Sequence, residues 1–539
     1  MQRRKNCLGI DLGTTNSTVF IAESSNSSRC VLDGNHIPSC ICFPDKKKDS
    51  NTIDIGSDPT SKDEVAGRVV RQFKLLFGLK YNEKDAKTWQ KRFLAKLTKD
   101  KDGYYAFDIP SQGVVTIQTL YELMISDFYK KALKANGDLP FLEVRLTYPA
   151  EYSQDQIALL RCAAENVIKD SPVKVISEPT AAAICYTLVH TNKTGIFVIY
   201  DLGGGTFDVS IIRVSSDGRY EVLGHSGSKD IGGCTFDMKI FKWLESKYKE
   251  DAAERLDVDK EELSLLLREE DEFTKEDIQQ SKKMLLKECE TAKEALTLES
   301  EVDIDVSEYF AKLFKYLDKQ EGSEEDEANI ENEYSYLISR TTFEQLIRQE
   351  IEETIDITLE CIRNNGFSID NINRVLLVGG SSRIPLVKKR LEEVFGSYRV
   401  GEDIDYRICV AQGASLRGHN SFVITDYTKN AICNWNGRRY KELIPAGERL
   451  PYSTTLPLIH ISQNTGSKQF PLYEQMRGGK YQRLKRFDLD ENKITDMDYT
   501  LKIWLKIDED GEMVISFYKT DSNGEKDELI QTSRHNIYH

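Results

Sequence analysis

Two short stretches of the chain combine an aspartate with glycines and threonine, residue types that suit binding of a phosphate chain. In one of them an apolar run, 198–200, leads into Asp201, three consecutive glycines and Thr206. Consecutive glycines are costly to order unless a ligand must approach the backbone closely. Successive N–H groups can then form an anion-binding nest, and a carboxylate such as Asp201 can hold Mg²⁺ through water. A tight hairpin with an acidic rim is the alternative.

The same order of residues recurs near the N-terminus, where an apolar segment precedes Asp11 and Gly13. This internal repeat predicts two similar lobes that each offer a glycine hairpin to one phosphate chain. A third apolar segment, 375–378, ends in paired glycines before a helix, which brings a helix N-terminus against a ligand. The contacts that we expect in these turns, and in a further Gly-Gly turn before a helix, are Gly13, Thr14, Thr15, Asn16, Gly203, Gly204, Gly205, Thr206, Gly232, Gly233, Gly380, Ser381 and Arg383.

These motifs resemble those of the actin-fold ATPases. Residue by residue, they resemble most the motifs of the seventy-kilodalton heat-shock chaperones of the DnaK type. Segment 10–17 is similar to the opening of that family, and 176–183 is similar to its Glu-Pro-Thr-Ala-Ala-Ala segment. The resemblance implies a two-lobed α/β actin-like ATPase domain over 1–417, an apolar interdomain linker over 418–428 and a β-sandwich substrate-binding domain over 429–539. Nothing in the sequence corresponds to the family's C-terminal helical lid, so we expect a short form.

The resemblance also implies catalytic roles. Lys74 matches a family lysine that points at the terminal phosphate, where a cation would neutralise charge that develops during phosphoryl transfer. A solvated lysine on a helix is the alternative, because the charged segment 61–98 is predicted to be helical. Glu178 and Thr206 are expected to position water. Asp11 and Asp201 are expected to organise Mg²⁺ through water, with K⁺ as a further candidate ion.

The adenosine side of the expected site lies on a predicted helix. Glu290, Lys293 and Thr297 are three and four residues apart, so they share one helix face and match the family's adenosine-side helix. An ordinary ion-paired helix surface is the alternative. Two residues depart from the family pattern: Glu294 replaces an arginine that packs on the base, and Arg407 replaces an aspartate. Glu294 puts the affinity for adenine in question, and Arg407 puts the strength of coupling between the domains in question.

Composition limits the remaining possibilities. A chain of 539 residues is too long for one core and implies several domains. The net charge of −15 argues against nucleic acid as a partner. No stretch approaches the roughly 20 apolar residues that span a bilayer, and no apolar signal segment follows the basic start, so we expect a cytoplasmic protein without membrane contact. Eleven irregularly spaced cysteines indicate reduced thiols.

Between the motifs, periodicity predicts a helix over 116–136, a strand that closes at Pro149, a helix over 153–168 and a strand over 173–176. Ile157 stands where the family has an arginine that relays the nucleotide state, so we expect weaker coupling between domains. Lys174 keeps a positive charge where the family contacts J-domain proteins and the linker. The acidic run 321–333 resembles an insertion and is predicted to be disordered.

The segment 418–428 is apolar where a spacer would be polar. We expect Phe422, Val423 and Ile424 to dock on a lobe in one nucleotide state, and Asp426 matches a family aspartate used in partner coupling. The alternative is that these residues form the first strand of the next domain.

Residues 429–539 show short apolar runs separated by turn signals, which is typical of a β-sandwich. A sandwich can bind extended peptide through backbone bonds and an apolar pocket. The candidate pocket residues are Ile459, Ile461, Phe470 and Leu472, and inward-facing core positions are the alternative.

These features predict an ATP-dependent chaperone that binds ATP or ADP with Mg²⁺ and captures exposed apolar segments of unfolded polypeptides. A J-domain co-chaperone and a nucleotide-exchange factor are the expected partners. Two alternatives remain: a non-catalytic exchange factor or adaptor of related fold, and an actin-fold kinase of a small molecule.

Overall fold

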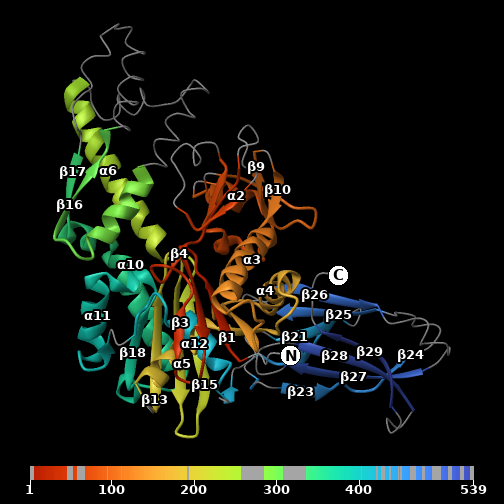
Figure 1. The fold of residues 1–539 in the computed structure, drawn as a ribbon. Helices are drawn as coiled ribbons and strands as arrows, with labels where there is room; N and C mark the ends of the chain where they lie inside the picture. The colour runs from red at the N-terminus through yellow and green to blue at the C-terminus, as the bar shows by residue number, and fades with distance from the viewer. Residues whose placement is uncertain are drawn as a thin grey trace.

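Figure 1 shows the arrangement of the chain in a computed structural model. The structure describes all residues except 1–4, 45–51, 58–66, 91, 94, 111, 191–193, 257–284, 308–334, 402–403, 421–422, 426–430, 436–438, 447, 450–451, 462–468, 476–479, 489–498, 508–512, 522–526 and 535–539. The acidic run 321–333 therefore lies outside the described residues. In the part that is described, no helix is both long enough and apolar enough to cross a membrane.

The first lobe is built on a sheet whose centre is the predicted N-terminal hairpin. The strands of this sheet, in spatial order, are β12 (Val173–Ser177), β11 (Glu143–Tyr148), β1 (Cys7–Leu12), β2 (Asn16–Ala22) and β3 (Ser28–Cys30), with β4 (Ile37–Pro38) also paired to β2. β1 and β2 run antiparallel, whereas β11 runs parallel to β1. The predicted strand before Pro149 is therefore confirmed, and it lies directly beside the first hairpin.

The second lobe repeats this topology. Its main sheet contains, in spatial order, β19 (Val400–Gly401), β18 (Arg374–Val378), β13 (Gly195–Leu202), β14 (Phe207–Val214) and β15 (Arg219–Ser228). Here too the first two strands form an antiparallel hairpin and a later strand, β18, lies parallel to the first. The internal repeat seen in the sequence thus corresponds to a repeated sheet, and the prediction of mixed α/β structure is confirmed.

Helices follow the strands in the same order in both lobes. They are α3 (Ile117–Ala135), α4 (Gln154–Val167) and α5 (Glu178–Val189) in the first half, and α10 (Arg340–Asn364), α11 (Pro385–Phe395) and α12 (Cys409–Arg417) in the second. α5 and α12 pack very closely, because a Cβ at Gly413 would lie 1.8 Å from the carbonyl oxygen of Ala181. The predicted helices over 116–136 and 153–168 are confirmed.

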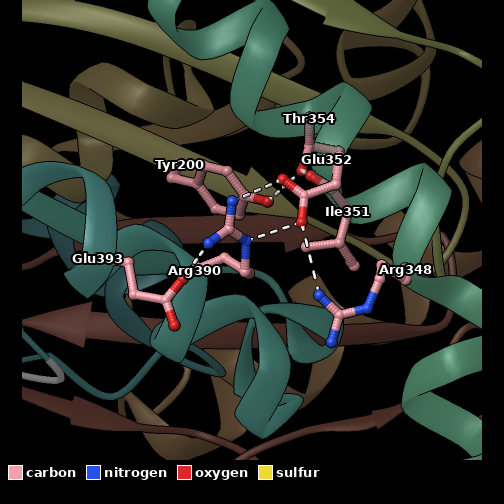
Figure 2. A network of polar contacts seen from close by, with 7 residues as sticks. All are labelled: Tyr200, Arg348, Ile351, Glu352, Thr354, Arg390 and Glu393. Carbon is pink, nitrogen blue, oxygen red and sulfur yellow. Dashed lines mark hydrogen bonds and ion pairs between the residues drawn. The ribbon is translucent and has the colours of Figure 1, made fainter.

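A polar network joins the two helices that cover the second sheet (Figure 2). Arg390 of α11 donates from Nε and Nη2 to the two carboxylate oxygens of Glu352 on α10, at 2.7 and 2.8 Å. Nearby, the hydroxyl of Tyr200 lies 2.6 Å from that of Thr354, which ties β13 to α10. The side chain of Tyr200 is therefore anchored to α10, at the position immediately before Asp201.

Further elements extend each lobe above the main sheets (Figure 1). In the first lobe they are β5 (Cys40–Cys42), β6 (Asp54–Ile55), β7 (Val69–Arg71), the 3₁₀ turn Phe73–Leu76, α2 (Glu83–Gln90), β8 (Lys96–Lys99), β9 (Tyr105–Ile109) and β10 (Gly113–Thr116). In the second lobe they are α6 (Gly233–Leu256), a helix over 285–295, β16 (Glu301–Asp305) and β17 (Ser335–Ser339). The second lobe also contains the 3₁₀ turns Ile369–Asn371, before β18, and Gly380–Arg383, after it.

The prediction of a helix around Lys74 is wrong. β-branched Val69 and Val70 belong to β7, which pairs with β5, and β-branched side chains suit a pleated strand better than a helix. Gln72 then takes a left-handed backbone conformation, with φ 54°, before a short 3₁₀ turn that carries Lys74. This turn directs the chain out of the strand.

The C-terminal part consists of two antiparallel sheets that share one core. One sheet contains, in order, β22 (Tyr440–Ile444), β21 (Ile432–Trp435), β25 (Gln469–Gln475) and β26 (Tyr481–Asp488); the other contains β23 (Tyr452–Thr455), β27 (Tyr499–Ile507), β28 (Met513–Thr520) and β29 (Asp527–Arg534), with β24 (Ile459–Ile461) paired to β27. In β27, buried Leu501, Ile503 and Leu505 alternate with partly exposed residues, as expected for a strand with one face in a core.

The segment between the two parts forms a strand of the second lobe. β20 (Val423–Thr425) runs parallel to β15 at the edge of the lobe's sheet, with Ile424 opposite Tyr220. This favours docking on a lobe over the alternative of a first sandwich strand. Phe422 and Asp426, the other residues predicted to act here, lie outside the described residues.

Candidate functional site

A cleft of about 460 Å³ lies between the two lobes. Both glycine hairpins, the turn after β18 and the helix over 285–295 contribute to its walls. The predicted residues that line it are Asp11, Gly13, Thr14, Thr15, Asn16, Lys74, Glu178, Asp201, Gly203, Gly204, Thr206, Glu290, Lys293, Thr297, Gly380, Ser381 and Arg383. Most of the predicted nucleotide-site residues, drawn from distant parts of the sequence, therefore meet around one cavity.

The two hairpins approach each other so closely that glycine is required. A Cβ at Gly204 would lie 2.2 Å from Oγ1 of Thr15, across the cleft. At the third turn, Gly379 has φ +80°, and a Cβ there would lie 2.4 Å from Oδ1 of Asp201. At these turns the backbone segments approach so closely that side chains would fill the space, and such glycine turns suit a phosphate-binding nest.

Three of the predicted glycines support the second hairpin and are not among the residues that line the cleft. Gly205 lies behind the wall, since a Cβ there would be 2.6 Å from the Leu75 side chain. The backbone N–H of Gly233 donates to the carbonyl oxygen of Gly203 at 3.0 Å, and a Cβ at Gly232 would be 2.5 Å from the backbone of Gly205. Their role in this structure is to brace the turn.

Lys74 and Glu178 form a buried ion pair in the cleft. Nζ of Lys74 lies 2.7 Å from Oε1 of Glu178, and the two side chains are only 12% and 13% exposed. Burial acts to lower the pKa of Lys74, but the carboxylates of Glu178 and Asp11 outweigh it and raise that pKa. Lys74 is therefore a permanent cation at neutral pH, held with its charge towards the space between the hairpins.

Carboxylates crowd the same space. Asp11 accepts a 2.7 Å hydrogen bond from the hydroxyl of Thr147, which fixes its orientation. Burial, together with the nearby charges of Glu178 and Asp208, raises the pKa of Asp201 well above its usual range. This excess of buried negative charge is an environment that a divalent cation would stabilise.

The donor set fits magnesium held through water. Oxygen ligands are what Mg²⁺ prefers, and it usually keeps several waters and binds one or two carboxylates plus substrate phosphates. In the described part of the chain, no group of three or more His, Cys, Asp or Glu side chains is arranged to coordinate a metal directly. Asp11 and Asp201 would thus hold a hydrated ion, as the sequence predicted, and this assignment stays a prediction.

Asp208 is a cleft residue that the sequence analysis missed. It accepts a hydrogen bond from the hydroxyl of Thr206 at 3.1 Å, and burial, with the charges of Glu178 and Glu151, raises the pKa of Asp208 to about 7. A signal was present, because Asp201 and Asp208 flank the glycine turn symmetrically and face each other across the hairpin. Pairing the residues on either side of the glycine turn, outward from Leu202 and Phe207, places Asp208 opposite Asp201.

The adenosine-side prediction places three residues on one wall. Glu290, Lys293 and Thr297 all line the cleft from the helix over 285–295 and the turn after it. Lys293 nevertheless forms an ion pair within the protein, because its Nζ lies 2.7 Å from Oδ1 of Asp237 on α6. Lys293 is thus ion-paired as in the alternative, but it is buried and lines the cleft, so its contact with adenosine stays a prediction.

Two of the four residues predicted to form a peptide pocket have side chains that the structure describes, and both are buried. Phe470 is 7% exposed and Leu472 is fully buried in the sandwich core, where Phe470 packs edge-on against Phe517. The structure therefore favours the core alternative for these two residues. The backbone of Ile459 and Ile461 pairs with β27, while their side chains are outside what the structure describes.

Lys174 and Ile157 belong to the first lobe. Lys174 is partly exposed on β12, and its predicted contact with a partner remains a prediction. Ile157 is 4% exposed and belongs to the core of the lobe. An arginine at this position would thus face the core of the lobe in this structure, not its surface.

Comparison with known protein families agrees with this architecture. The family model described as Hsp70 protein matches residues 7–536 of the chain, a span that includes both lobes, the connecting strand and the β-sandwich. The match covers nearly the whole sequence, so the two lobes and the β-sandwich belong to one family architecture. The chain therefore belongs to the Hsp70 family of molecular chaperones, whose members are ATPases that bind ATP and ADP with Mg²⁺.

Proposed function

We propose that this protein binds and hydrolyses Mg-ATP in the cleft between its lobes and couples the nucleotide state to capture of unfolded polypeptide segments. The observation that carries the proposal is the meeting of two glycine hairpins, a buried cation and several carboxylates around one cavity. Its volume of about 460 Å³ is in the range of small-molecule sites.

In this proposal the backbone N–H groups of the hairpins hold the phosphates. Lys74, kept charged by Glu178, neutralises the charge that develops as the terminal phosphoryl group is transferred. Glu178 and the Thr206 hydroxyl orient the attacking water. Asp11 and Asp201 would hold a hydrated magnesium ion, which would supply positive charge against the phosphates.

The β-sandwich is the proposed polypeptide-binding part, and β20 is the proposed coupling element. β20 adds to the sheet of the second lobe beside β15, whose other neighbour is the hairpin strand β14. A change at the hairpin can thus reach the connecting segment through one sheet. A J-domain co-chaperone and a nucleotide-exchange factor are the proposed partners.

Steady-state ATP hydrolysis tests the proposal, measured with and without an unfolded client and a J-domain protein. We expect slow basal turnover that both additions raise. Phosphorylation of a small acceptor with no effect of client would instead support a small-molecule kinase. Tight ATP binding without turnover would support a non-catalytic exchange factor or adaptor.

A further inference from the structure

Four aromatic side chains, one from each strand of a sandwich sheet, gather over that sheet. They are Trp435 of β21, Tyr440 of β22, Tyr473 of β25 and Tyr481 of β26. The ring centres of Trp435 and Tyr473 each lie 4.9 Å from that of Tyr440. Tyr440 and Tyr481 come from the two edge strands of the sheet, and their rings stack with centres 3.6 Å apart. These four rings form one contiguous surface, the aromatic face.

The strand register places the aromatic face on the side of the sheet away from the sandwich core. Residues directly opposite each other in an antiparallel pair share a face, and Trp435 lies opposite Tyr440. Leu472 and Glu474, the neighbours of Tyr473 along β25, are both buried, so alternation turns Tyr473 the other way. Trp435 is 38% exposed and the three tyrosines are partly exposed. The aromatic face is therefore accessible to a partner.

Exposed cations flank the aromatic face at both edges of the sheet. They are Arg439 and Lys441 at the β22 edge, and Lys480 and Arg483 at the β26 edge. Arg483 lies directly opposite Tyr473, so it shares the face with the rings. Glu442 is the exposed carboxylate in the described parts of 439–442 and 480–483. The sequence 477–486 contains five Lys or Arg and no Asp or Glu, in a chain whose net charge is −15. Positive charge is thus concentrated locally around the rings.

An aromatic centre with cationic edges suits an acidic peptide that also carries apolar side chains. Tryptophan, tyrosine and arginine contribute most of the binding energy at protein interfaces, and arginine binds carboxylates through paired hydrogen bonds. A nucleic acid fits less well. Tyr440 and Tyr481 stack on each other, which covers ring planes that bases would need. The net charge of −15 also opposes a polyphosphate chain more than a peptide with a few carboxylates.

We propose that the aromatic face and its flanking cations bind an acidic polypeptide segment that carries aromatic or aliphatic side chains. This surface is distinct from the predicted client pocket, because Phe470 and Leu472 lie in the core on the other side of the same sheet. None of the four aromatic residues lines the nucleotide cleft. The inference therefore goes beyond the proposed function, and it holds whether or not the cleft hydrolyses ATP.

Fluorescence anisotropy of labelled peptides with the full chain, without nucleotide, tests the inference. The probe is a short peptide with a centre of phenylalanine and leucine and glutamates on both sides. One comparison peptide has serine in place of the apolar residues, and a second has lysine in place of glutamate. We expect the probe to bind about 10-fold or more tightly than the serine peptide, because the aromatic contacts are then lost. Its affinity should fall as salt rises from about 0.05 to about 0.3 M, because exposed charges are screened.

Two variants locate the binding surface. Trp435→Ala should weaken binding of the probe by about 10-fold or more. Arg483→Glu should weaken the probe by about 5-fold through repulsion, without weakening the lysine peptide. The matched controls are Trp504→Ala and Lys506→Glu, because both residues are partly exposed on β27 of the other sheet. Both controls should bind the probe normally. Thermal unfolding of each variant verifies that it folds.

Three results would overturn the inference. The first is a probe affinity that neither Trp435→Ala nor Arg483→Glu changes, or a probe that does not bind at all. The second is a single-stranded oligonucleotide that binds more tightly than the probe and is lost in the same variants, which would assign the aromatic face to nucleic acid. The third is a dimer of the chain, seen by sedimentation, that Trp435→Ala dissociates, which would assign the face to a second copy. ATP hydrolysis is measured separately, so failure of the proposed function remains distinguishable from all three.

Discussion

Lys74 and Glu178 are 104 residues apart in sequence, and their charged atoms meet at 2.7 Å inside the cleft. Lys74 comes from a 3₁₀ turn after β7, and Glu178 is the first residue of α5, directly after β12. Both side chains are nearly buried. Because removal of one member of a buried pair leaves the other charge uncompensated, each residue fixes the state of its partner.

Lys74→Ala should lower ATP turnover by about 100–1000-fold while ATP affinity changes little, because the lysine opposes charge that develops mainly in the transition state. Single-turnover hydrolysis and equilibrium ATP binding, measured on the same preparation, check this. Lys87→Ala is the matched control, because Lys87 is an exposed lysine on α2 of the same lobe. Turnover that is unchanged in Lys74→Ala would remove this residue from the chemistry.

Asp201→Asn should act in opposite directions on activity and on stability. The amide removes a charge that holds the hydrated magnesium ion, so the Mg²⁺ concentration needed for half-maximal turnover should rise. It also removes a buried carboxylate whose raised pKa reports an unfavourable charge in the nucleotide-free protein, so the melting temperature should rise by a few degrees. A magnesium titration and thermal unfolding without nucleotide measure the two effects. A variant that is less stable and normally active would contradict both.

Sequence patterns located the glycine turns of the cleft because glycine, aspartate and threonine in fixed order carry a local constraint. Asp11, Asp201 and the turns around them could be found without knowledge of the fold. Other cleft residues could not be found in this way, since His36 and Tyr406 are ordinary residues until the fold brings them to one cavity. The same is true of Phe470 and Leu472, because an apolar strand residue can face a core or a pocket with the same sequence spacing.

Ile157→Arg shows how burial changes an inference drawn from sequence. Ile157 is 4% exposed in the core of the first lobe. An arginine there would bury an unpaired charge and should lower the free energy of unfolding by about 3 kcal/mol or more. Urea denaturation of the variant measures this. Normal stability together with stronger stimulation of ATP turnover by peptide would show instead that position 157 reaches an interface and that an arginine restores coupling.

The ion pair between Glu352 of α10 and Arg390 of α11 should make the free energy of unfolding depend on pH. Hydrogen bonds from Arg390 lower the pKa of Glu352, so its stabilising contribution is present above the unfolded pKa of about 4.3 and is lost as the pH falls through the lower folded value. Since the Glu352 side chain is 38% exposed, Glu352→Gln should cost only about 0.5–1 kcal/mol at pH 7. Thermal unfolding from pH 7 to about 3 should show this difference shrinking with acidity. Glu353→Gln, on an exposed position of α10, is the control, and a difference independent of pH would argue against the ion pair.

The pairing of β20 with β15 gives a direct test of coupling. Ile424 lies opposite Tyr220 in a parallel ladder at the sheet edge. Ile424→Pro removes a backbone N–H and fixes φ, so it should detach the segment from the second lobe without altering the cleft. We expect basal ATP affinity within about two-fold of the natural protein and loss of most of the stimulation of turnover by unfolded client, because coupling requires that client and nucleotide bias the same element.

Ile424→Ala separates the backbone from the side chain in this experiment. It keeps the backbone N–H and the freedom of φ that proline removes, so a variant that couples normally would show that strand pairing is sufficient. Loss of coupling in both variants would assign the effect to the apolar side chain as well. The decisive comparison is client-stimulated turnover divided by basal turnover at saturating ATP. If Ile424→Pro keeps the full ratio, the nucleotide state does not act through β20, and communication between the lobes and the sandwich must use another contact.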